Sequence, residues 1–229
     1  MPGAVQWPNV RIAITGNVAT ISPDSDTGSG SFIEAIENLR TSAGVRCLVL
    51  DLTKPVAPPL EDSALKSLVY YTLPMVCAFS GILHGHALEL ALSADIRVCD
   101  AESTIRGPLS SQAARQRLGK LCPGPDLSRL LEAGATISAD EARSVGLVSA
   151  VTAPGEAIVE AARLARTIAS RGPIATQLGK EAVWRGLDLS FAAALRFETD
   201  LTLLLQSTKD RTEGVAAFLQ KRLPEFTGE

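Results

Sequence analysis

The sequence predicts an α/β domain followed by a helical C-terminal segment. Two apolar stretches, residues 45–52 and 73–81, are continuous rather than alternating, which is typical of strands buried on both faces of a sheet. Stretches with helical spacing accompany them at residues 31–44, 63–72 and 86–95. This alternation of buried strand and helix predicts an α/β fold.

Turn residues and prolines define the other elements of the α/β part. Three prolines (Pro55, Pro58 and Pro59) exclude helix and central strand from residues 53–62, which we therefore expect to form a loop. The remaining predictions are a β-hairpin around Gly16–Asn17 over residues 10–23, a loop over 24–31, a helix end at Gly44, and a strand followed by a turn over 96–107.

Every stretch from about residue 113 onward looks helical. Ser138 is a candidate N-cap because acidic residues follow it in the first turn, and Gly146 ends that helix. The expected helices cover residues 113–122, 126–134, 138–146, 155–172, 173–187 and 189–207. We predict a core domain over residues 1–170 and a helical segment over residues 171–229.

Composition narrows the class of protein. The 229 residues are 46% hydrophobic and carry a formal charge of −3, so nothing suggests a general attraction to nucleic acid. No apolar run approaches the roughly 18–20 residues that span a bilayer, and the opening residues lack the pattern of a secretory signal. The four widely spaced cysteines suggest buried free thiols rather than a zinc site, and we expect a cytoplasmic location.

Both histidines of the chain lie in the stretch SGILHGHALELALSAD at residues 80–95. His86 and Glu89 are three residues apart at a predicted helix start, so their side chains can face each other and form a general-base pair. The plainer interpretation is a solvent-lined turn that precedes an ordinary helix. A metal site needs at least three ligands with suitable geometry; His84, His86 and Glu89 would supply three, but we expect no metal here.

Three stretches resemble the crotonase (enoyl-CoA hydratase/isomerase) superfamily. They are LPMVCAFSGILHGHALELALSADIRVCD at residues 73–100, GATISADEARSVGLVSAV at residues 134–151, and STKDRTEGVAAFLQKRLPEFTG at residues 207–228. Their combination and order are similar to the family pattern over about residues 45–229.

The resemblance implies a crotonase-type spiral of ββα units with a C-terminal helical segment used for trimerisation. It also implies an acyl-CoA thioester as substrate or ligand, no permanently bound cofactor, a role in fatty acid metabolism, and a homotrimer or dimer of trimers. Shared family chemistry stabilises a thioester enolate with two backbone N–H groups while carboxylates move protons.

The chain departs from that pattern in its active site. Glu89 matches the first catalytic glutamate, but Leu109 stands where the family has the second, so the two-glutamate hydratase mechanism is incomplete. His86 occupies the position of the oxyanion-hole glycine, and its backbone N–H could still donate. The proline loop leaves Ala57, Leu60 or Glu61 to supply the other N–H, and Ala57 is our candidate.

Family positions also suggest the ligand-binding residues. His84, Leu88 and Leu109 match the acyl pocket, whereas Phe218 and Lys221 match positions near the CoA nucleotide. The alternatives are that Glu89 pairs with Arg97 or Arg106 and that Lys221 is part of a solvated helix end. Asp95 is expected to be structural, and an apolar stripe that includes Leu195, Leu203 and Leu204 is expected to form core or trimer interface.

Three functions remain open on these observations. One is an acyl-CoA lyase or isomerase that uses Glu89 with His86 as the proton shuttle. The others are a non-catalytic acyl-thioester-binding protein and a subunit that supports an active partner. We favour the enzyme, of a kind other than a standard two-glutamate hydratase.

Overall fold

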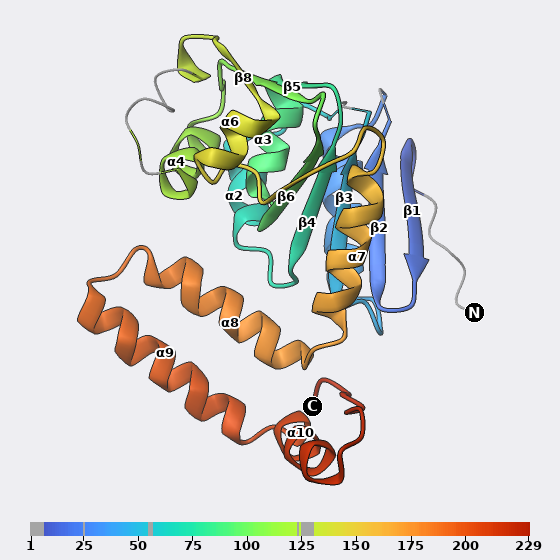
Figure 1. The fold of residues 1–229 in the computed structure, drawn as a ribbon, viewed down its shortest axis with the longest axis vertical. Coiled ribbons are helices and arrows are strands. Elements are labelled where there is room, and N and C mark those ends of the chain that lie inside the picture. Colours follow the sequence, from blue (N-terminus) through green and yellow to red (C-terminus); the bar gives the residue numbers. More distant parts are fainter. Residues whose placement is uncertain (1–6, 25, 55–56, 123, 125–130) are drawn as a thin grey trace.

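A computed structural model describes residues 7–24, 26–54, 57–122, 124 and 131–229. Its main element is a six-stranded sheet in the order β1-β2-β3-β4-β6-β9, in which only the β1–β2 hairpin is antiparallel (Figure 1). A second, three-stranded sheet has the order β5-β7-β8.

The elements follow the chain in a fixed order. They are β1 (Val10–Thr15), β2 (Val18–Pro23), α1 (Ser29–Thr41), β3 (Cys47–Leu52), α2 (Asp62–Val69), β4 (Met75–Phe79), β5 (Ile82–His84), α3 (Gly85–Ser93), β6 (Ile96–Asp100), β7 (Thr104–Arg106), α4 (Gln112–Leu121), β8 (Thr136–Ser138), α6 (Ala139–Ser144), β9 (Ala150–Thr152), α7 (Ala157–Ala169), α8 (Pro173–Gly186), α9 (Phe191–Gln206) and α10 (Lys209–Gln220).

The central strands are buried on both faces, as their continuous apolar sequences predict. In β3, Leu48 and Leu50 face the larger core, whereas Cys47 and Val49 face the smaller one. The side-chain period of two along a strand produces this division. The main sheet is therefore a central layer with helices on both sides.

Helix α7 covers the face of the sheet that carries the smaller core. Its buried residues are all alanines spaced four apart, namely Ala157, Ala161, Ala165 and Ala169. Their short side chains let the helix lie close to the valines of β3, β4 and β6. Helices α1, α2 and α3 contribute to the larger core on the opposite side.

The α/β prediction is confirmed, but four short strands differ from it: β5 and β7, which lie where turns are predicted, and β8 and β9. The hairpin, the two buried strands and the N-cap at Ser138 are present as expected, and Glu141 completes a capping box there. Residues 136–138 and 150–152 form β8 and β9, although they were expected to be helical or connecting. Both strands are only three residues long, too short for the sequence to show a period of two. The predicted helix over 126–134 lies mostly outside the described residues.

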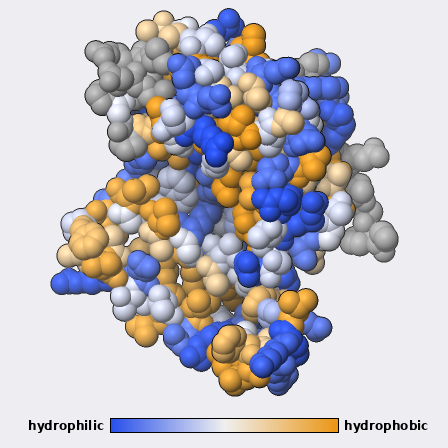
Figure 2. All heavy atoms as spheres, viewed as in Figure 1, coloured by the Kyte–Doolittle hydropathy of each residue, from blue (hydrophilic) through white to orange (hydrophobic). Residues whose placement is uncertain are grey.

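The C-terminal helices extend away from the sheet. Helices α8 and α9 pack side by side, and α10 lies at the end farthest from α3 (Figure 1). Large apolar side chains on them are exposed, and orange atoms gather over this part of the molecule in Figure 2. Leu203 is 63% exposed and Phe191 is 80% exposed, so these helices do not bury their apolar faces within one chain.

All four cysteines are free and buried. Burial raises the pKa of the Cys47, Cys77 and Cys99 thiols to about 12, which leaves them protonated and unreactive. Among the described residues, the helices are too short or too polar to cross a membrane.

Candidate active site

His86 and Glu89 form a hydrogen-bonded pair at the start of α3. Strand β5 ends directly before Gly85, whose φ of +54° lies in the left-handed region that favours glycine. The following helical turn places His86 Nδ1 3.0 Å from Glu89 Oε2. The His86 side chain is 44% exposed, whereas that of Glu89 is 1% exposed. A solvent-facing ring therefore rests on a buried carboxyl group.

The second oxygen of Glu89 is held by two backbone N–H groups. Ser110 N and Ser111 N lie 2.7 Å and 2.6 Å from Oε1. With a carboxylate as acceptor, His86 donates from Nδ1, and in the neutral imidazole this tautomer leaves the lone pair on Nε2. Glu89 thus orients the ring and has no oxygen without a donor, while the exposed His86 presents the basic nitrogen.

A third element fixes the segment that donates to Glu89. Ser111 is the N-cap of α4: its Oγ accepts from Ala114 N at 3.0 Å and donates to Asp62 Oδ1 in the first turn of α2. The Ser111 hydrogen bond is the main cause that lowers the pKa of Asp62. Helices α2, α3 and α4 are therefore joined through Asp62, Ser111 and Glu89.

Ser110, Ser111 and Asp62 were not among the predicted site residues. A signal for Ser111 was present, because a serine before the helical stretch that starts at Gln112 is a typical N-cap. That its N–H would meet Glu89 depends on how α3 and α4 pack, which a local pattern does not specify.

Neither arginine considered as an alternative partner of Glu89 binds it among the described residues. Arg97 donates to the carbonyl oxygens of Leu147 at 2.7 Å and Ala94 at 2.6 Å. No ion pair joins Glu89 to Arg97 or Arg106 in the part of the chain that the structure describes. The prediction that Glu89 faces His86 is confirmed, and the alternative arginine pairing is wrong.

The predicted acyl-pocket residues differ in their exposure. Leu109 is 4% exposed and Leu88 is 1% exposed, and both belong to the larger core. His84, at the end of β5, is exposed to solvent. Leu109 has no carboxylate, whereas the backbone N–H groups of its neighbours Ser110 and Ser111 donate to Glu89.

The structure shows the surroundings of the two proposed oxyanion donors. His86 N lies in the first turn of α3, where N–H groups have no partner within the helix. Ala57 is half-buried against the larger core, in the segment before α2. Pro55, which belongs to the same predicted loop, lies outside the described residues.

Phe218 and Lys221 do not meet His86 within one chain. Phe218 is 81% exposed on α10, and Lys221 ends that helix with a φ of +54°. Figure 1 places α10 at the opposite end of the molecule from α3. Phe218 and Lys221 would therefore contact a His86–Glu89 site only in a neighbouring subunit.

Asp95 has the structural role expected for it. It accepts from Met75 N at 2.8 Å and from Trp184 Nε1 at 3.0 Å, and it pairs with Lys180 Nζ at 2.7 Å. Burial lowers the pKa of Lys180, and the charge of Asp95 opposes that shift. This cluster attaches α8 to the end of β4.

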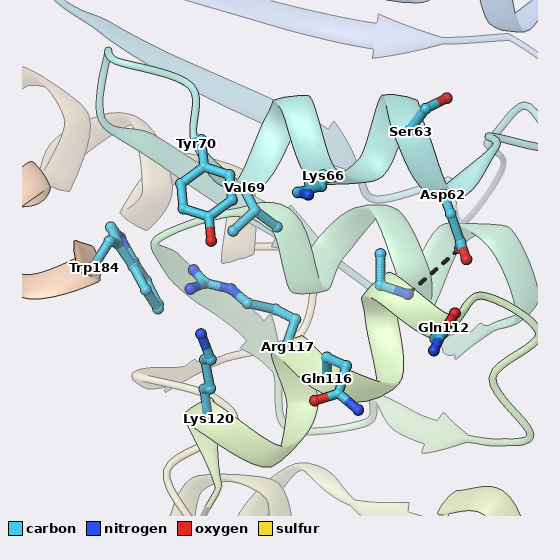
Figure 3. Close-up of a pocket in the computed structure, with 11 residues that line it drawn as sticks. Asp62, Ser63, Lys66, Val69, Tyr70, Gln112, Gln116, Arg117, Lys120 and Trp184 are labelled. Atoms are coloured by element: carbon cyan, nitrogen blue, oxygen red, sulfur yellow. Dashed lines mark hydrogen bonds between the residues drawn. The ribbon is translucent and has the colours of Figure 1, made fainter. Parts of the chain in front are cut away.

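A cavity of about 380 Å³ lies beside Asp62, between α2, α4 and Trp184 of α8 (Figure 3). Its lining includes Lys66 and Tyr70 from α2 and its C-cap, and Arg117 from α4. The predicted acyl-pocket residues are not part of this lining. No group of three or more potential metal ligands occurs among the residues that the structure describes.

Comparison with known proteins agrees with the resemblance. The family model described as enoyl-CoA hydratase/isomerase matches residues 59–229. A probable mitochondrial enoyl-CoA hydratase 2 of Arabidopsis thaliana is 32% identical over 200 residues, which cover 81% of this chain and 66% of that protein. The 2,3-dehydroadipyl-CoA hydratase of Escherichia coli is 30% identical over 211 residues, which cover 88% and 79%.

Solved structures show the same fold. The enoyl-CoA hydratase of Bacillus anthracis superposes with a TM-score of 0.84 at 26% identity, covering 96% of this chain and all of that one. This chain spans only 57 to 66% of the length of the plant and mammalian mitochondrial relatives that it matches. The family match over three quarters of the sequence and the shared fold lead to one conclusion: the chain belongs to the crotonase (enoyl-CoA hydratase/isomerase) family.

Proposed function

We propose that the protein acts on an acyl-CoA thioester and moves a proton through an enolate with a single base, His86. The observation that carries this proposal is the arrangement around Glu89. Its carboxyl group accepts from Ser110 N, Ser111 N and His86 Nδ1, so it is an orienting group rather than a free base. The exposed imidazole then takes the role of proton acceptor.

The proposed reaction is a 1,3-proton shift. His86 Nε2 takes a proton from the α carbon of a 3-enoyl thioester, and the C–H electron pair becomes a conjugated enolate. The N–H groups of His86 and Ala57 are our candidates for stabilising the oxygen charge. The imidazolium then returns the proton to the γ carbon, which gives the 2-enoyl thioester without any other reactant.

Hydration fits this site less well. It needs one group to activate water and another to donate to carbon, and Leu109 offers neither. The side chains of His84, Leu88 and Leu109 remain our candidates for the acyl pocket, and we propose Phe218 and Lys221 as CoA contacts supplied by a neighbouring subunit.

The division at residue 170 is part of the same proposal. Residues 1–170 carry the site, and residues 171–229 form the assembly segment, for which we propose a homotrimer or a dimer of trimers. Four free buried cysteines suit a reducing compartment, so we keep the cytoplasm as the proposed location, although the plant relative is named as mitochondrial.

A second candidate is a non-catalytic acyl-CoA-binding protein or a supporting subunit. Leu109 favours it, because one of the two carboxylates of the family is absent. Under this hypothesis the ligand binds, but no proton is exchanged at its α carbon.

The experiment is an isomerase assay with 3-hexenoyl-CoA, together with exchange of the α proton in D₂O. We expect the 2-enoyl product to form faster than crotonyl-CoA is hydrated. His86→Gln should lower kcat by roughly 10²–10⁴-fold, because it removes the base. Glu89→Gln should lower kcat less, by roughly 10- to 100-fold, and alter its pH profile, because it disturbs the orientation of the ring.

Calorimetry with a CoA thioester serves as the control for both variants. Retained binding with lost turnover supports the proposed roles. Full activity of His86→Gln would refute the assignment of the base, and binding without any α-proton exchange in the unmodified protein would establish the second candidate.

A further inference from the structure

The 380 Å³ cavity beside α2 and α4 has a positively charged wall that the proposed reaction does not use. Its size lies in the range of small-molecule sites. Lys66 from α2, together with Arg117 and Lys120 from α4, lines this space, and Trp184 lies at one side of it (Figure 3). The charges and the apolar surface together indicate what kind of molecule would fit.

Arg117 is the buried cation of this wall. The residue is 3% exposed, and its Nε and Nη2 donate to the carbonyl oxygens of Leu92 at 3.0 Å and Ala94 at 3.4 Å. Nη1 has no hydrogen-bond partner, and no carboxylate within the described ranges lies at ion-pairing distance. Burial, together with the charge of Arg97, lowers the pKa of Arg117 to about 9. A buried, incompletely paired guanidinium is a site where an anion is favourable.

The other charges of the wall leave it positive. Asp62 is the one carboxylate in the lining, and it is already engaged by Ser111. Lys120 is paired with Asp188. Lys66 lies on the exposed side and has no hydrogen-bond or ion-pair partner within the residues that the structure covers. Arg117 and Lys66 are therefore the two cations with capacity for a ligand.

Apolar surface lies next to these cations. Trp184 stacks on the Arg117 guanidinium, with 3.1 Å between Arg117 Cζ and the ring centroid. The indole Nε1 of Trp184 donates to Asp95 Oδ1 at 3.0 Å. Val69 adds aliphatic surface, and Tyr70, which is about half exposed, directs its hydroxyl toward Arg117 in Figure 3. Nη1 is itself covered, so a ligand would reach it only when a neighbouring side chain moves.

We propose that this cavity binds a carboxylate on a short apolar stem, with the carboxylate between Arg117 and Lys66 and the stem against Val69 and Tyr70. The carboxylate could belong to a free acid or to the far end of an acyl group on the proposed thioester. The second source rests on the proposed function, and its support is that Asp62 of the wall accepts from Ser111, whose N–H binds Glu89.

Trp184 provides the readout for the test. The chain has two tryptophans, so Trp7→Phe leaves Trp184 as the single fluorophore. In this background, titration with hexanoate should change the emission in a saturable manner, whereas hexanol and inorganic phosphate should not. Lys66→Glu should weaken hexanoate binding by about tenfold or more. Arg166→Glu, an exposed charge reversal on α7, should leave it unchanged.

Several results would overturn the proposal. They are the absence of saturable binding, equal binding of hexanol, and equal effects of Lys66→Glu and Arg166→Glu. Arg117→Lys is a second probe, but it removes the contacts to α3 and requires a check of folding by circular dichroism. Lys66→Glu keeps the test valid even if Arg117→Lys does not fold.

Competition distinguishes the two sources of the carboxylate. If the site holds the end of an acyl group, an acyl-CoA with a terminal carboxylate should displace hexanoate and bind more tightly than its methyl-ended equivalent, and Lys66→Glu should remove that preference. If the site takes a free acid, hexanoate should still bind when crotonyl-CoA is saturating. None of these measurements requires turnover, so failure of the isomerase assay would leave this test intact.

Discussion

At the scale of single residues, the environment of Glu89 decides its chemistry. A glutamate that moves protons needs an oxygen within reach of the substrate. Here two backbone N–H groups bind Oε1, and the His86 ring covers Oε2. His86 is both the residue that departs from the family glycine and the exposed member of the pair. In the proposed reaction, the histidine in the glycine-rich turn takes the part of the base that a second glutamate would otherwise supply.

Leu109 provides the prediction at this scale. We expect Leu109→Glu to introduce hydration of crotonyl-CoA, because it restores a second proton-transfer group next to the segment that holds Glu89. The new polar group replaces a leucine that is 4% exposed, so it should lower the free energy of unfolding by about 2–4 kcal/mol. Enoyl absorbance and urea unfolding measure the two effects.

Leu109→Gln is the matched control for this variant. It carries a similar cost of burial but transfers no proton. Hydration that rises equally in both variants, or in neither, would contradict the view that Leu109 is what separates this site from a two-glutamate hydratase.

At the scale of elements, the site depends on the contact of three helices. Helix α3 carries His86 and Glu89, the residues before α4 donate to Glu89, and α2 holds Ser111 through Asp62. A close approach of the chain supports the same segment, because a Cβ on Gly107 would lie 1.3 Å from the carbonyl oxygen of Leu131. The start of α4 is therefore constrained from two sides.

Ser111→Ala tests this arrangement. The variant loses the N-cap of α4 and the bond to Asp62 but keeps the N–H that Glu89 accepts. We expect the free energy of unfolding to fall by about 1–2 kcal/mol and kcat of the isomerase reaction to fall by about three- to tenfold, with KM nearly unchanged.

The N-cap of α9 offers a comparison. Ser190 accepts from Ala193 N at 3.4 Å and caps a helix far from the site. Ser190→Ala should lose about 1 kcal/mol of stability and no activity. If both caps affected kcat equally, Ser111 would have no specific role in positioning Glu89.

At the scale of the whole molecule, the C-terminal helices expose more apolar surface than a lone chain needs. Leu203 and Leu204 on α9 are 63% and 60% exposed, and Phe218 on α10 is 81% exposed. Leu203 and Leu204 belong to the stripe that the sequence places in core or trimer interface, and the single chain buries neither of them. Contiguous apolar surface of this kind is typical of an interface between subunits.

Light scattering tests the proposed trimer. We expect a mass three, or six, times the 24.1 kDa of one chain. Leu203→Asp should shift the assembly toward monomer, because it places a charge in the proposed interface. Val159→Asp, at a 64% exposed position on α7, should leave the mass unchanged. A monomeric unmodified protein would contradict the proposed assembly and the delivery of Phe218 and Lys221 to a neighbouring site.

Local sequence patterns predicted most of the fold. The continuous apolar runs of β3 and β4, the hairpin at Gly16 and the N-cap at Ser138 each depend on neighbouring residues, so their patterns were sufficient. Strands β5, β7, β8 and β9 were missed because three residues contain too little periodicity. The pairing of β5 and β8 with β7, and of β9 with β6, is what makes them strands.

By itself, the sequence determined the α/β class, the family pattern and the closeness of His86 to Glu89. That last contact follows from helical geometry, since residues three apart share one face of a helix. Only the tertiary structure decided that Ser110 and Ser111 bind the remaining oxygen of Glu89, and that Arg117 meets Trp184 beside a cavity. Those contacts join residues 21 to 67 positions apart, and the packing of separate helices, rather than any local pattern, brings such residues together.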